Sequence, residues 1–89
     1  MKAILTVVGI DRPGIIYRVS EALYKFNINI LDFSQTIMED KFVAIINIDL
    51  AKASDDFTNI SDYFTKLGEE NGLSIRLQNE KLFDKMHRI

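Results

Sequence analysis

The spacing of apolar residues changes along the chain between a repeat of two and a repeat of about 3.6, and the order of these changes restricts the fold more than any other feature. Strand spacing occupies residues 2–10, 28–38, 42–50 and 73–77, and helical spacing occupies residues 15–26 and 57–67. The predicted order is therefore strand, helix, strand, strand, helix, strand.

This order is the split β-α-β pattern of the ferredoxin-like fold, an α+β sandwich with a four-stranded antiparallel sheet and two helices on one face. The topology places the first and third strands in the middle of the sheet. Residues 2–10 and 42–50 are mostly apolar at both odd-numbered and even-numbered positions, as is typical of strands buried on both faces. The two patterns thus support the topology independently.

Local signals mark where the helices begin and end. Pro13 is expected in the first turn of the first helix, where the missing N–H is not needed, and Asn27 is expected in a left-handed conformation at its end. Residues 54–56 supply a capping side chain for the second helix, which Asn71 and Gly72 close.

The second strand segment changes phase. Ile28 and Ile30 share one parity, whereas Leu31, Phe33 and Ile37 share the other. A β-bulge or a second buried face would each explain the change, and the pattern does not decide between them. Glu39 and Asp40 follow as the turn of a hairpin.

Length and composition limit the classes of protein. The chain has 89 residues, which is room for one domain, predicted over residues 1–80, with residues 81–89 as a short helical extension. It has 11 Lys and Arg against 13 Asp and Glu and a net charge of −2, which disfavours nucleic acid and anionic membranes as partners. With no cysteine, no signal peptide and no long apolar span, a cytoplasmic location is expected.

A thin core and uncovered sheet surfaces favour a homodimer. A chain of this length buries only about 60–65% of its unfolded surface. The predicted fold also leaves the second sheet face and the long edge segment at residues 28–38 without cover. Whether two copies join through their edges or through their faces stays open.

The loop between the first strand and the first helix is the candidate ligand site. A helix N-terminus has free N–H groups and a partial positive charge, so it attracts anions. Gly14 allows close approach and Arg12 adds a donor suited to a carboxylate, while Asp11 and the side-chain oxygen of Asn29 suit an ammonium group. The alternative is that Asp11 only caps the helix.

The chain resembles the ACT domain, a small ligand-binding regulatory module. The resemblance rests on Val-Gly-Ile-Asp-Arg-Pro-Gly-Ile-Ile at residues 8–16, on Val19 and Leu23, and on Asn-Ile-Asn-Ile at residues 27–30. The chain is most similar to the small free-standing ACT proteins related to the glycine cleavage system transcriptional regulator. Many ACT domains have glycine where this chain has Asn27, which tolerates the same conformation.

The resemblance implies a protein that is not an enzyme, has no cofactor, and binds an amino acid or related metabolite between subunits. The output then passes to a separate partner protein, because no second domain is fused here. The residues implicated by the loop chemistry and the resemblance together are Gly9, Asp11, Arg12, Gly14, Ile15 and Asn29.

Other functions remain open on the sequence. An acylphosphatase-like hydrolase would use Arg12 for phosphate, although the glycine-rich loop of that family is missing, and RNA binding lacks a basic and aromatic third strand. A dimer without any ligand is the remaining alternative. No metal is expected, because His87 has no cysteine or second histidine to join it.

Overall fold

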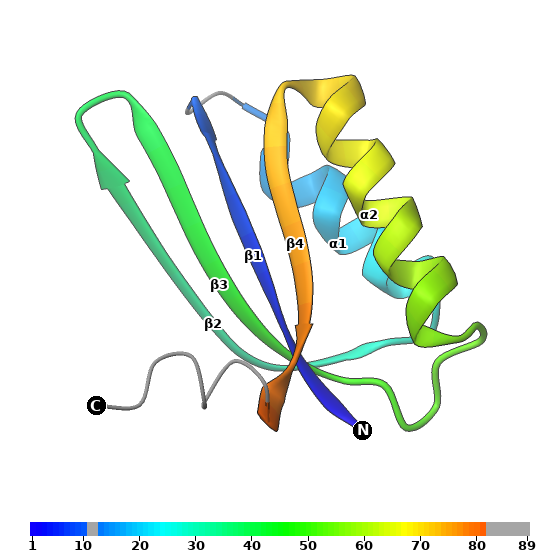
Figure 1. The fold of residues 1–89 in the computed structure, drawn as a ribbon. Helices are drawn as coiled ribbons and strands as arrows, with labels where there is room; N and C mark the ends of the chain where they lie inside the picture. Colours follow the sequence, from blue (N-terminus) through cyan, green and yellow to red (C-terminus); the bar gives the residue numbers. More distant parts are fainter. Residues whose placement is uncertain (11–12, 82–89) are drawn as a thin grey trace.

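The computed structural model describes residues 1–10 and 13–81 and confirms the ferredoxin-like sandwich (Figure 1). The sheet order is β2-β3-β1-β4 with every neighbouring pair antiparallel, so β1 and β3 are central as predicted. Both helices lie on one face of the sheet. The elements are β1 (Lys2–Ile10), α1 (Ile15–Lys25), β2 (Asn29–Met38), β3 (Lys41–Asp49), α2 (Phe57–Asn71) and β4 (Leu73–Asn79).

The core lies between the sheet and the two helices. Alternate residues of the central strands, such as Leu5 and Ile46, are fully buried there. Phe64 of α2 is also fully buried, and its ring lies 5.9 Å from that of Tyr63 and 6.4 Å from that of Phe26 between the ring centroids. These contacts anchor α2 and the end of α1 to one another.

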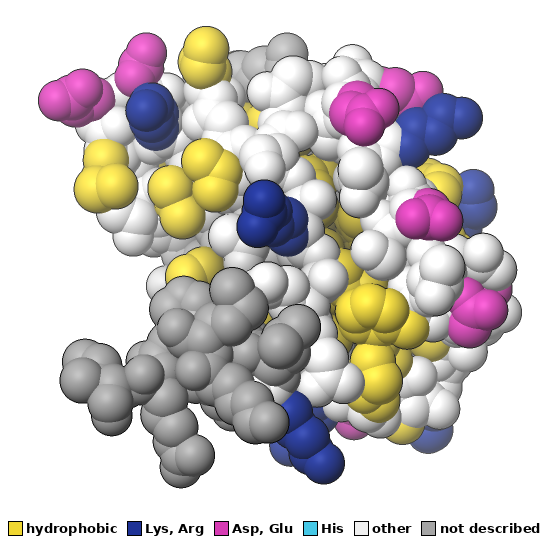
Figure 2. Space-filling model, in the orientation of Figure 1, with side chains coloured by type: hydrophobic (Ala, Val, Ile, Leu, Met, Phe, Trp, Pro, Cys, Tyr) yellow, Lys and Arg dark blue, Asp and Glu magenta, His cyan; other side chains and the backbone are white. Residues whose placement is uncertain are grey.

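The sheet face opposite the helices is less covered than the two-sided apolar pattern predicts. On this face of β1, Ile4 is buried and Val8 half-buried, but Ile10 is 66% exposed. Ile45 of β3 and Met38 of β2 are exposed as well. Apolar side chains gather beside acidic ones around the hairpin at the upper left of Figure 2. The prediction of two buried faces is therefore correct only in part, because both helices cover the same face.

A β-bulge explains the phase change in β2. Its pairing with β3 is regular from Met38, opposite Lys41, to Asp32, opposite Asn47, and then shifts so that Ile30 lies opposite Ile48. The extra residue in β2 turns every earlier side chain to the other face. The bulge, rather than a second buried face, is therefore the correct alternative.

The helix ends agree with the sequence except at Pro13. The N-cap of α1 is Gly14, in the left-handed region at φ 90°, and the first helical residue is Ile15. Pro13 therefore lies before the cap and shapes the turn, so its predicted place in the first helical turn is wrong. Asn27, at φ 57°, and Gly72, at φ 68°, are left-handed as predicted.

The start of α2 follows the expected capping chemistry. Asp56 is the N-cap, and its Oδ1 accepts a hydrogen bond from the backbone N–H of Asn59 at 2.8 Å. The predicted helical extension at residues 81–89 lies almost wholly outside the described residues. Over the described ranges, none of the helices has the length and apolar character needed to span a membrane.

Candidate ligand-binding site

The structure separates the predicted site residues into two groups. Gly9, Gly14 and Ile15 lie where β1 ends and α1 begins, whereas Asn29 begins β2 at the other end of the sheet. Asn29 and Lys2 both lie opposite Asp49, so they are at the same height in the sheet. Gly9 is seven residues further along β1 than Lys2, which corresponds to about 23 Å at about 3.3 Å per residue. Asp11 and Arg12 lie outside the described residues. One copy of the chain therefore does not bring the two groups together.

Gly9 has a packing role. A Cβ atom at Gly9 would overlap the Leu73 side chain of β4 and lie 3.4 Å from the carbonyl oxygen of Gly72. The absence of a side chain at Gly9 therefore lets β4 begin close beside the end of β1. This explains Gly9 without a ligand.

Within the described residues, the start of α1 is open and has no side-chain cap. Gly14 makes no side-chain cap hydrogen bond, and its carbonyl oxygen accepts the N–H of Arg18 at 3.1 Å. Of the residues that the structure describes, none lies within 4 Å of a Cβ placed at Gly14. Gly14 occupies the N-cap position, and the Asp11 side chain, the predicted alternative cap, lies outside the described residues. The N–H groups of the first turn thus have no side-chain acceptor from the cap position.

A shallow cleft of about 220 Å³ lies at this helix start. Arg18 brings a permanent positive charge to it, which adds to the partial positive charge of the helix terminus. The buried Ile15 side chain supplies an apolar wall. The cleft is lined by Pro13, Gly14, Ile15, Arg18, Asn71 and Leu73. Its charge suits a carboxylate.

A larger pocket of about 470 Å³ lies at the opposite end of the sheet, around the beginning of β2. Asn27 holds its rim, because its Nδ2 donates to the carbonyl oxygen of Lys52 at 3.0 Å. The N–H of Ser54 donates to the carbonyl oxygen of Phe26 at 2.8 Å and fastens the same two segments. The pocket is lined by Asn27, Ile28, Asn29, Asp49, Ala51 and Lys52.

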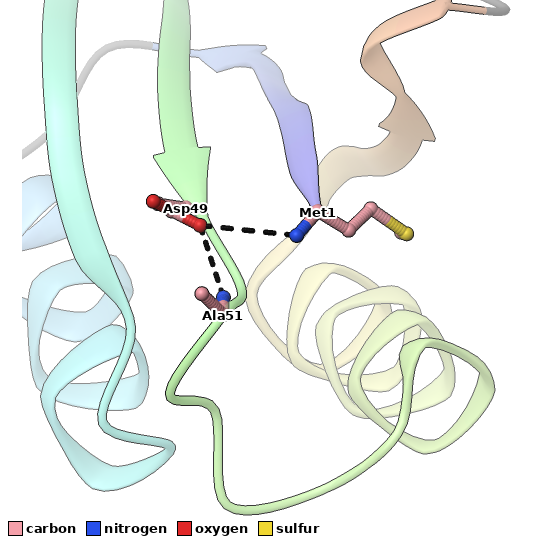
Figure 3. Close-up of polar contacts among 3 residues, drawn as sticks. All are labelled: Met1, Asp49 and Ala51. Carbon is pink, nitrogen blue, oxygen red and sulfur yellow. Dashed lines mark hydrogen bonds and ion pairs between the residues drawn. The ribbon is translucent and has the colours of Figure 1, made fainter.

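Asp49 is the acidic residue of this larger pocket, and the sequence analysis missed it. Its Oδ1 accepts the N–H of Ala51 at 3.0 Å and lies 4.0 Å from the amino group of Met1 (Figure 3). Both charged groups of this ion pair are more than 30% exposed, so their attraction is weak. The phase change in β2 was the available signal, since the bulge is what sets Asn29 opposite Asp49.

The two shifted pKa values in the described part of the chain belong to exposed side chains outside both pockets. The Tyr17 hydroxyl donates to Oε2 of Glu21 at 3.0 Å, and this hydrogen bond to the carboxylate raises the pKa of Tyr17. The Asn59 side chain donates to Asp55 and, with the N–H of Asp56, lowers the pKa of Asp55. Residues 1–10 and 13–81 contain no group of three or more acidic or histidine side chains placed to hold a metal ion.

A family model of the ACT domain, a regulatory small-molecule-binding fold, matches residues 2–78. The chain belongs to the ACT-domain family, within the group of small UPF0237 proteins. It is 45% identical over 86 residues to a UPF0237 protein of Methanococcus maripaludis, covering 97% of this chain and 96% of the relative. A UPF0237 protein of Bifidobacterium longum is 47% identical over 88 residues, covering 99% and 98%.

Solved structures agree with this assignment. An ACT domain protein from Streptococcus pneumoniae superposes with a TM-score of 0.82 at 33% identity, covering 94% of each chain. A putative glycine cleavage system transcriptional repressor superposes with a TM-score of 0.74 at 23% identity, covering 86% of this chain and 44% of the repressor. The second likeness shows the fold alone.

Proposed function

We propose that the protein is a homodimeric sensor that binds an amino acid between its two copies and signals to a separate partner protein, without catalysing a reaction. Membership of a small-molecule-binding regulatory family supports the general role. The lack of cysteine favours the cytoplasm as the place where it acts. Ligand binding would stabilise one arrangement of the dimer, and the partner protein would read that difference.

The separation of the site residues carries this proposal. Gly14 and Ile15 lie at one end of the sheet and Asn29 at the other. When two copies pair antiparallel through β2, the start of β2 in one copy lies beside the end of β2 in the other. The end of β2 is also the end of the sheet at which β1 finishes, because Ile37 and Gly9 both lie opposite Phe42. The dimer therefore supplies two shared sites.

The β2 strand has the properties of such an interface. It is the outer strand of the sheet and is exposed along its whole length. Ile30, Phe33 and Ile37 point to the helix side of the sheet and form what we call the β2 edge surface. An uncovered edge strand with apolar side chains on one face favours pairing with another strand.

Helix α1 is oriented to extend this surface. The Lys25 ammonium lies 5.3 Å from the centre of the Tyr63 ring of α2, so the Lys25 flank of α1 faces α2. Helical geometry places Ile16 and Ser20 on the opposite flank, toward β2. A second copy paired through β2 would bring the two α1 helices together along these residues.

The site chemistry suits the two charged ends of an amino acid. The start of α1, with Arg12, would bind the carboxylate, and Gly14 would allow the backbone to approach. Asp11 and the Asn29 side-chain oxygen would accept hydrogen bonds from the ammonium group. Ile15 would contact the ligand side chain.

Thermal unfolding of the purified dimer with each standard amino acid and with nucleotides tests the function. A ligand at about one hundred times its dissociation constant adds about 2.7 kcal/mol to the free energy of unfolding. We expect stabilisation by one amino acid or a few related ones, and we expect Asp11→Ala to abolish it.

The control variant is Asp62→Ala, which removes an exposed acid from α2 and is expected to keep the response.

The open β2 edge also suits a second function, a dimerisation or protein-interaction module without a ligand. The absence of stabilisation by any amino acid or nucleotide would contradict the sensor and favour this module.

A further inference from the structure

We propose that Asp49 receives the ammonium group of the bound amino acid, together with Asn29, and so makes the site selective for ligands with a free α-amino group. This inference rests on the proposed function and specifies its ligand chemistry. Asp49 lies outside the β1–α1 loop, at the end of β3.

The first observation is the position of Asp49 in the sheet. Residues directly opposite one another on antiparallel strands point to the same face, with Cβ atoms about 4.5–5.5 Å apart. Asn29 and Asp49 are such a pair. If β2 continued without its bulge, Asn29 would lie opposite Leu50 instead. The bulge therefore brings an amide and a carboxylate together at the pocket.

The second observation is that Asp49 retains capacity to accept hydrogen bonds. Oδ1 accepts the N–H of Ala51, and the Met1 amino group at 4.0 Å is beyond hydrogen-bond distance. An ionised carboxylate has about four acceptor positions on its two oxygens. Among the described residues, no hydrogen bond is made to Oδ2. Asp49 thus has a pre-positioned carboxylate with an oxygen available to a ligand.

The rest of the pocket adds a positive charge and an apolar wall. Lys52 lines the same pocket as Asp49 and adds an exposed positive charge to it. Ile28 is buried and supplies an apolar part of the lining. The volume of about 470 Å³ lies within the range of small-molecule sites. In the shared site, these groups contact the ammonium end of the ligand, and the helix start of the other copy binds its carboxylate.

The rim of the pocket is fixed, which favours selectivity. The left-handed Asn27 is joined to the carbonyl of Lys52, and Ser54 is joined to Phe26. The Asp49–Ala51 hydrogen bond holds the turn that follows β3. The acceptor oxygens are therefore held in place before a ligand arrives, which reduces the ordering cost of binding.

Asp49→Asn tests the role, because asparagine keeps Oδ1 as the acceptor for Ala51 and replaces the charged Oδ2 with a neutral NH2 donor. The probes are the standard amino acids, followed by the carboxylic acid that has hydrogen in place of the α-amino group of the tightest binder. Dissociation constants come from calorimetric titration of the intact dimer. The matched control is Asp62→Asn on α2.

We expect Asp49→Asn to weaken binding of the amino acid about tenfold to a hundredfold, the usual effect of losing a hydrogen bond to a charged group. Binding of the amine-free acid should stay unchanged, so the variant should lose the preference for the amino group. Asp62→Asn should bind both probes as the unmodified chain does.

Two results would overturn the role of Asp49 and leave the sensor intact. One is unchanged affinity for the amino acid in Asp49→Asn. The other is an equal loss of affinity for the amino acid and the amine-free acid, which would indicate a structural role. If the unmodified dimer bound none of the amino acids, the sensor and the role of Asp49 would both be wrong.

Discussion

Phe33→Glu is expected to convert the proposed homodimer into a folded monomer. Phe33 is 40% exposed in a single copy and lies in the centre of the β2 edge surface, between Ile30 and Ile37. In a two-fold dimer the substitution places a carboxylate in the interface from both copies. Burying a carboxylate without a partner costs several kcal/mol, so association should weaken by orders of magnitude.

The measurement is sedimentation equilibrium, with circular dichroism to verify that the variant stays folded. Ser34→Glu is the matched control, because it adds the same charge to the next residue of β2 on the opposite sheet face. We expect Ser34→Glu to remain dimeric. A monomeric Ser34→Glu beside a dimeric Phe33→Glu would instead indicate that the two copies join through the open sheet faces.

Phe64→Ala is expected to lower the free energy of unfolding by about 3–5 kcal/mol. The Phe64 side chain is fully buried, and its ring contacts those of Phe26 and Tyr63. The substitution leaves a cavity at the point where α2 meets the end of α1. Since small domains have total stabilities of about 5–15 kcal/mol, this is a large fraction of the whole.

Urea denaturation at fixed protein concentration measures this effect, because the stability of the proposed dimer would depend on concentration. Tyr24→Ala is the control. Its side chain is 86% exposed, so we expect a change within about 0.5 kcal/mol. A loss below about 1 kcal/mol in Phe64→Ala would contradict the packing described for the core.

The fold was predictable because each element has a clear period and a clear end. The buried positions of α2, among them Ile60 and Phe64, follow the helical repeat, and Gly72 ends the helix in the left-handed region. Pro13 was misplaced because Gly14 occupies the N-cap. The turn geometry, rather than the preference of proline for the first helical turn, determined where α1 begins.

Burial at the edges was harder to predict, because it depends on what covers each strand. Phe33 has the apolar parity of a core residue, but β2 is an edge strand and its side chain remains 40% exposed. Ile10 is exposed for a similar reason, at the end of a sheet face that the helices do not cover. The period of the apolar residues shows which face of a strand is apolar, but it does not show which element covers that face.

The candidate site was predictable only in pieces. The sequence indicates a helix start with free N–H groups after the first strand, but Gly9 is explained by its close approach to Leu73. Asn29 and Gly14 belong to the same sequence motif, but they lie at opposite ends of the sheet. Asp49 was missed because its position opposite Asn29 depends on the bulge, a matter of strand register rather than of local sequence.

The central claim is that each binding site takes its helix start from one copy and Asn29 from the other. A heterodimer of one Asp11→Ala copy and one Asn29→Ala copy tests it most directly. In a shared-site dimer, one site of this heterodimer has both substitutions and the other has neither. If each copy instead built its own site, both sites would carry one substitution.

The measurement is calorimetric titration of the heterodimer, purified through two different tags, with the amino acid that stabilises the unmodified dimer. Each homodimeric variant should show no binding. We predict that the heterodimer binds at half the stoichiometry of the unmodified dimer and with the same affinity. A heterodimer without binding, in titrations where the unmodified dimer binds, would contradict the shared site.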